Sequence, residues 1–200
     1  MQFSTFVLTA LSMGSAIASP VNTGYAGFNT AAIAIANVNV IVQQEAININ
    51  TITSGSAKAD TVAKVQKSLL TVGQSINSLI GPVIALGNAR SSSLNKEQIA
   101  DLPKFQNDYQ KILVSLEAIG KRVTGSNLDK AAIAQIKPEL QWVLASPGPI
   151  ARPIIAFVEV AAPKYATYSY WTPYFINIEA IIVVALAPIA LGLGLDISIL

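Results

Sequence analysis

The chain contains neither cysteine nor histidine among its 200 residues. The absence of histidine excludes Ser-His-Asp and Cys-His catalytic arrangements, because both need an imidazole that titrates near neutral pH. The absence of cysteine excludes thiol nucleophiles, disulfides, iron–sulfur clusters and every zinc site that contains cysteine. The eleven carboxylates show no EF-hand spacing. We therefore expect a protein without a metal site, a cofactor or catalytic residues.

Charge is also scarce. Charged residues make up 12% of the chain, about half the usual ~25%, whereas hydrophobic residues make up 52%. The net charge of +2 is too small to indicate a nucleic-acid partner. The length is typical of one domain, and the aliphatic content is enough for a substantial core.

The first eighteen residues have the pattern of a secretory signal peptide. An apolar stretch from Phe3 to about Met13 is followed by Ala16-Ile17-Ala18, which fits the A-x-A cleavage pattern. We expect residues 19–30 to be a flexible lead-in and residues 31–200 to form a single helical domain. The predicted location is extracellular or in the cell wall. A secreted domain without disulfides must be stabilised by helix packing.

The segment from Ala31 to Ile52 has an ambiguous pattern. Apolar residues at Ile33 and Ile35, and again at Val38, Val40 and Val42, alternate as in a strand. Part of the same set also fits a helical stripe. The length of the run and its many alanines favour a helix over a strand.

Two later segments show clear helical periodicity. Apolar residues recur every three or four positions from Val62 to Val83 and from Phe105 to Val123. Such stripes must be buried against other helices, so we predict an all-α bundle of four to six amphipathic helices, with no internal repeat of fixed period. An apolar C-terminal helix, from Ile176 to about Leu191, is expected to be buried among them.

Local signals suggest where these helices begin and end. We expect Gly81-Pro82 to loosen or end the first, and Asn95 to cap the next with Gln98 at the capping-box position. Pro103 is expected to restart or kink that helix. Further signals predict a helix opened by Ser126 with Asp129 and interrupted at Pro138, a turn at residues 146–149, and a short helix over residues 154–162.

The order of these segments resembles the fungal hydrophobic surface binding protein A family, which includes cell-wall mannoproteins. The resemblance covers about residues 31–162 and includes ADTVAKVQKSLLTVGQSINSLI and SLNKEQIADLPKFQNDYQKILVSLEAIGKRV. It implies a small secreted helical protein that adsorbs to hydrophobic surfaces or encloses fatty acids between its helices, and it implies no catalytic residues.

We therefore predict a non-catalytic protein that binds hydrophobic surfaces or fatty-acid-like lipids by burying apolar area, with cell-wall polymer as another candidate partner. The expected ligand-binding residues lie in the two stripes: Val65, Leu69, Val72, Ile76, Ile112, Leu116 and Ile119. Six aromatic residues between positions 165 and 175 are candidates for contact with a surface, because Tyr and Trp suit a boundary between water and an apolar phase. They are Tyr165, Tyr168, Tyr170, Trp171, Tyr174 and Phe175.

Two other functions stay open from the sequence. Residues 163–200 comprise the aromatic segment and an apolar tail, and a GPI-type or membrane-inserted tail would instead make this a wall- or membrane-anchored structural protein. A hydrolase would need a carboxylate pair, for which Glu45, Glu159 and Glu179 are candidates because each lies in an apolar stripe. Nothing in the sequence sets a distance between these carboxylates.

Overall fold

The computed structural model describes residues 25–55, 60–87, 94–161 and 191–192. The described chain forms six helices and no strand, which confirms the all-α prediction. The helices are α2 (Ala26–Ser54), α3 (Thr61–Asn77), α4 (Ile80–Gly87), α5 (Lys96–Thr124), α6 (Lys130–Ala145) and α7 (Pro147–Ala161). The predicted leader, the first half of the lead-in, the aromatic segment and the predicted C-terminal helix except Leu191 lie outside the described residues.

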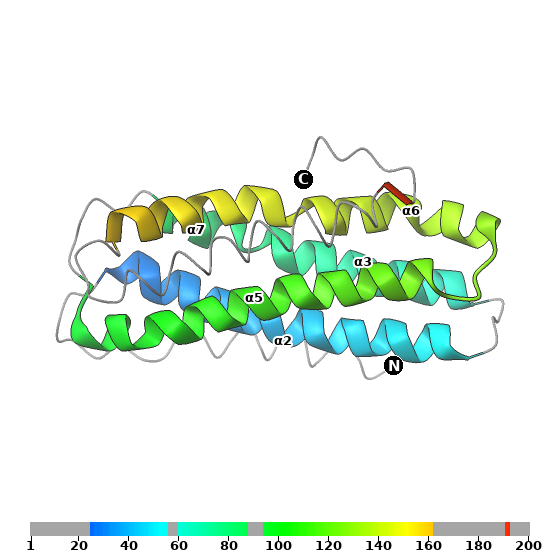
Figure 1. The fold of residues 1–200 in the computed structure, drawn as a ribbon, viewed down its shortest axis with the longest axis horizontal. Helices are drawn as coiled ribbons and strands as arrows, with labels where there is room; N and C mark the ends of the chain where they lie inside the picture. The colour runs from blue at the N-terminus through cyan, green and yellow to red at the C-terminus, as the bar shows by residue number, and fades with distance from the viewer. Residues whose placement is uncertain (1–24, 56–59, 88–93, 162–190, 193–200) are drawn as a thin grey trace, which may run out of the picture.

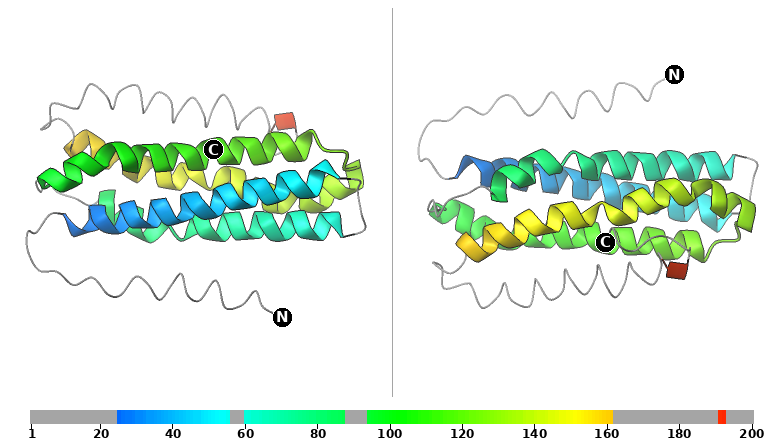
Figure 2. Two further views of the ribbon diagram at one scale, coloured as in Figure 1. Left: turned by 90° about the horizontal axis from the view of Figure 1, so that it is seen from below. Right: turned by 90° about the horizontal axis from the view of Figure 1, so that it is seen from above.

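The six helices form four rods of a bundle (Figure 1). Helices α3 and α4 make up one rod and α6 and α7 another, while α2 and α5 are rods by themselves. The chain reverses direction from each rod to the next, so α2 and α5 run parallel, and so do the two broken rods. Helix α2 packs against α5 and against the rod of α3 and α4 (Figure 2). The rod of α6 and α7 completes the bundle, because α6 contacts α3 and α5 and α7 contacts α4. Helices α3 and α5 therefore lie diagonally across the core.

The fold consists of two helical hairpins laid side by side. Helices α2 and α5, which begin the hairpins, both have 29 residues. Three side-chain pairs between them have a separation of 69 residues: Asn29–Gln98, Asn39–Asp108 and Thr53–Arg122. Gln66 of α3 donates to the carbonyl oxygen of Gln135 in α6 at the same separation. The two hairpins therefore pack in a single register.

Proline explains where the two broken rods are interrupted. A proline ring clashes with the carbonyl group four residues earlier. For Pro82 that residue is Ser78, the C-cap that follows α3, and for Pro149 it is Ala145, the last residue of α6. The break in the first rod thus precedes Gly81-Pro82 rather than coinciding with it. Each broken rod has a Gly-Pro dipeptide near the beginning of its second helix, at 81–82 and 148–149.

Several predicted boundaries are wrong. Helix α2 begins at Ala26, so the last five residues of the expected lead-in are helical. Helices α5 and α6 continue through Pro103 and Pro138, so α5 does not restart at Pro103 and α6 is not interrupted at Pro138. Helix α7 begins at Pro147 rather than near Ile154, since first-turn N–H groups have no partner within a helix and proline costs little there. Asp129, not Ser126, caps α6 by accepting from the N–H of Ala132 at 2.7 Å.

The capping box predicted at Asn95 is confirmed, and it also joins the two hairpins. The Asn95 side chain accepts from the N–H of Gln98, and the Gln98 side-chain oxygen accepts from the N–H of Asn95. The same oxygen accepts from the N–H of Tyr25, while the Gln98 amide nitrogen donates to the Tyr25 carbonyl and to Asn29. Gln98 is 2% exposed and therefore holds the beginning of α2 against the beginning of α5.

We expect Gln98→Ala to lower the free energy of unfolding by about 2 kcal/mol, because it leaves several partly buried backbone groups without partners. Chemical denaturation with circular dichroism measures the change. Gln74→Ala, at an exposed position of α3, is the matched control and should change stability by less than about 0.5 kcal/mol. Equal effects of the two substitutions would contradict this role of Gln98.

Candidate functional site

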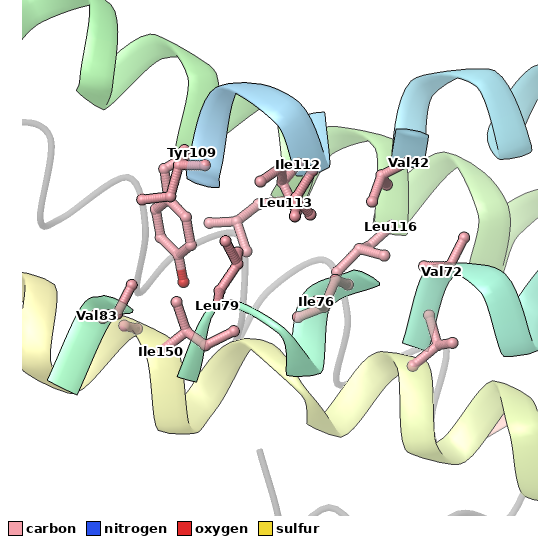
Figure 3. Close-up of a cluster of buried hydrophobic side chains, with 14 of the residues drawn as sticks. Val42, Val72, Ile76, Leu79, Val83, Tyr109, Ile112, Leu113, Leu116 and Ile150 are labelled. Atoms are coloured by element: carbon pink, nitrogen blue, oxygen red, sulfur yellow. The ribbon is translucent and has the colours of Figure 1, made fainter. Parts of the chain in front are cut away.

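The predicted ligand-binding stripes form the centre of the protein. Val65, Leu69, Val72 and Ile76 of α3, and Ile112, Leu116 and Ile119 of α5, are each between 0% and 1% exposed. Figure 3 shows side chains of the two stripes pointing toward one another across the bundle. The structure therefore brings the two stripes together as core residues. Ligand binding between them stays a prediction, and a ligand there would have to separate these side chains.

The other predicted site residues are described only in part. The six aromatic residues from Tyr165 to Phe175, and Glu179, lie outside the described residues, and the side chain of Glu159 is not described. Glu45 lies half-buried on α2 and accepts from the side chain of Asn48 at 3.2 Å. Within the described part of the chain, no three acidic groups cluster in a way that could hold a metal ion.

The outer face of α2 carries an exposed aliphatic row that was not predicted. Ile33, Val40 and Ile47 are 63%, 67% and 59% exposed, and their seven-residue spacing places them on one face of the helix. We call these three residues the α2 row. Their neighbours on the exposed side include Asn37 and Gln44, and the only charged residue of the helix is Glu45. The outer face of helix α2 therefore carries an aliphatic row among uncharged polar side chains.

The alternating pattern in the sequence was the signal for this row. Residues two positions apart in a helix are separated by about 200° around the axis, so they lie on nearly opposite faces. Ile35 and Val42 are buried, whereas Ile33 and Val40 are exposed. The pattern that resembled a strand is thus explained by a helix with apolar residues on two faces.

A shallow groove of about 380 Å³ lies beside this row, between α2 and α5. Five of its six lining residues have polar or charged side chains, and the sixth is Val114, which is 49% exposed. Gln43 contributes from α2, and it lies between Val40 and Ile47 on the helix surface. The lining residues are Gln43, Asn107, Gln110, Lys111, Val114 and Ser115.

A buried polar network fixes the position of α2 relative to α5 next to the groove. The Asn39 amide donates to Asp108 Oδ1 at 3.2 Å, and Lys104 Nζ lies 2.6 Å from Asp108 Oδ2. Gln43 donates to Asn39 Oδ1 at 2.7 Å. Asn39 and Asp108 are each 7% exposed, so their polar groups must be paired when the helices meet. This requirement favours the register in which the α2 row lies along the groove.

Two described segments are long and apolar enough to cross a membrane by length and composition alone: Ala26–Ser54, and Thr61–Leu86, which joins α3 and α4. Within the apolar windows of these segments, 33% and 39% of the residues are buried in the bundle. Core helices of soluble proteins can meet the same criterion. For α2, however, the exposed row contributes to the apolar character in addition to the core residues.

Comparison with known proteins adds no relative to these observations. No model of a known protein family, no curated protein and no solved structure matches the chain.

Proposed function

We propose that this protein is a secreted, non-catalytic protein that adsorbs to apolar surfaces and lipid through the outer face of α2. The observation that carries the proposal is the α2 row, in which three large aliphatic side chains are each about three-fifths exposed. Isolated exposed aliphatic residues are common, but a regular row on a helix with one charge is not needed for the core. The resemblance to hydrophobic surface binding proteins supports the same function.

Burial of apolar area would provide the free energy of adsorption. Full burial of a Val or Ile side chain contributes about 1.5–3 kcal/mol. Because the row residues are already partly covered, each would contribute about 1–2 kcal/mol on reaching an apolar phase. The buried polar network and the Gln98 contacts hold α2 on the bundle, so the helix can adsorb without unfolding.

The proposal is tested by adsorbing the secreted protein to octyl-coated beads and to uncoated beads of the same material. Hydroxyl-radical labelling then reports which aliphatic side chains become protected on the octyl beads. We expect protection at Ile33, Val40 and Ile47, and no change at Leu70 and Ile84, which are 41% and 49% exposed on the α3–α4 rod. Failure to adsorb, or equal protection at all five positions, would contradict the proposal.

The same sample distinguishes adsorption from lipid enclosed between the central stripes. Native mass spectrometry of the secreted protein detects a bound lipid by its added mass. Adsorption through α2 requires no co-purified lipid, because the α2 row lies outside the core. A stoichiometric fatty acid, together with unprotected row residues on the beads, would favour the enclosing mechanism instead.

A further inference from the structure

We propose that the groove between α2 and α5 binds the anionic headgroups of a lipid surface while the α2 row enters its apolar layer. This inference rests on the proposed function and adds the chemical class of the surface. It is carried by the position of Lys111, the one charged residue among those that line the groove. The other lining residues are amides, a serine and Val114, so the described walls contain no carboxylate to repel an anion.

The register of the two parallel helices places Lys111 along the α2 row. Contacts between α2 and α5 join residues 69 apart, as in Asn39–Asp108 and Thr53–Arg122. Lys111 therefore lies level with Val42, between the levels of Val40 and Ile47. The groove agrees with this placement, since Gln43 and Lys111 line it together. A lipid headgroup in the groove would thus be next to two of the three row residues.

The positive charge of Lys111 is available to a ligand. Lys111 is exposed, and none of the ion pairs of the described residues includes it. Asp108 is the acidic residue nearest to it in the sequence, but both carboxylate oxygens are engaged, one by Asn39 and the other by Lys104. Asp108 is also 7% exposed, so it faces the interface of the two helices rather than the solvent.

The groove also supplies hydrogen-bond donors suited to an oxyanion. Asn107, Gln110 and Ser115, whose side chains carry amide or hydroxyl donors, line it along with Lys111. Amide and hydroxyl donors combined with an ammonium group match a phosphate or carboxylate headgroup. The aliphatic row beside them matches the acyl chains. The combination therefore favours an anionic lipid surface over an uncharged one.

The test compares binding to vesicles of phosphatidylcholine with binding to vesicles of an equal mixture of phosphatidylcholine and phosphatidylglycerol. We expect the wild type to bind the anionic vesicles more tightly, and Lys111→Gln to weaken that binding about fivefold, as is typical for one lysine at an anionic surface. Lys67→Gln is the matched control, because it removes the same charge from an exposed position of α3. It should leave vesicle binding unchanged.

Adsorption to uncharged octyl beads separates this inference from the proposed function. All three proteins should adsorb to the beads equally, since the α2 row is intact in each. Normal bead adsorption with equal binding to both vesicle types, or with equal effects of Lys111→Gln and Lys67→Gln, would overturn the headgroup site alone. A wild type that binds neither beads nor vesicles would overturn both proposals.

Discussion

Replacing Ile33, Val40 and Ile47 together with asparagine is expected to weaken adsorption to octyl surfaces at least about a hundredfold. Each side chain is about three-fifths exposed, so each can still transfer a large apolar area from water to the surface. Three contributions of about 1 kcal/mol or more add to about 3 kcal/mol, which corresponds to the stated factor. Adsorption isotherms on octyl beads measure the change directly.

Asparagine suits this experiment because its helix propensity is close to that of valine and isoleucine. The substituted positions are exposed, so the midpoint of chemical denaturation should stay within the small range usual for surface substitutions. The control is the double variant Leu70→Asn, Ile84→Asn, which is compared with the double variant Val40→Asn, Ile47→Asn. Each double variant removes two exposed aliphatic side chains, but only Val40 and Ile47 belong to the α2 row.

The two pairs should therefore differ in adsorption and agree in stability. If the row variants adsorb like the wild type, α2 is not the contact surface. If the control pair loses as much adsorption as the row pair, the protein binds through its general apolar character and not through one face. Either result would leave the headgroup site without its proposed apolar neighbour.

The pattern of apolar residues was sufficient to predict the all-α fold and the two central stripes of its core, but not core residues such as Phe28. Apart from the partly buried Val62, the stripe from Val62 to Val83 and the stripe from Phe105 to Val123 are buried as expected, because a 3–4 spacing specifies which residues share a helix face. The capping box at Asn95 was also predictable, because it depends only on residues that are close together in the sequence.

The exposed row was not predictable in the same way. Periodicity shows that Ile33, Val40 and Ile47 share a face, but it cannot show whether another helix covers that face. Whether the face is covered depends on how α2 packs against its two neighbouring rods. That packing is determined by contacts between residues far apart in the sequence, such as Asn39 and Asp108. The breaks in the two broken rods were predictable only in part. Pro82 and Pro149 lie after the breaks, and the position of each break follows from the clash of the proline ring with the residue four positions earlier.

Stability above about pH 10 is expected to depend on Tyr109. Tyr109 is 1% exposed, and its hydroxyl lies among Leu79, Val83 and Ile150, near the break between α6 and α7 (Figure 3). Burial in these apolar surroundings raises the pKa of the phenol well above its ordinary value of about 10. The hydroxyl donates to the Pro147 carbonyl at 3.3 Å, so the neutral form has a partner in the folded state.

The sign of the pH dependence follows from this raised pKa. Above about pH 10 the unfolded chain releases the Tyr109 proton whereas the folded chain keeps it, so stability falls by about 1.4 kcal/mol per pH unit. Below the unfolded pKa the contribution is fully present. At about pH 12 the accumulated loss from this one group is about 2.7 kcal/mol, which is a large part of the stability of a small domain.

Tyr109→Phe isolates this contribution, because phenylalanine fills nearly the same volume and cannot ionise. At about pH 8 the variant should be less stable than the wild type by about 1 kcal/mol, since the Pro147 carbonyl loses its donor. At about pH 12 the order should reverse, because only the wild type has to keep a phenol protonated. Denaturation curves of both proteins across this range measure the crossing, and loss of lysine charge affects both equally.

Two results would contradict this prediction. The stability curves of the two proteins could stay parallel to about pH 12, or a phenolate absorbance from Tyr109 could appear while the helical signal is intact. Either result would show that the Tyr109 site admits the charged form and that its pKa is not raised by burial.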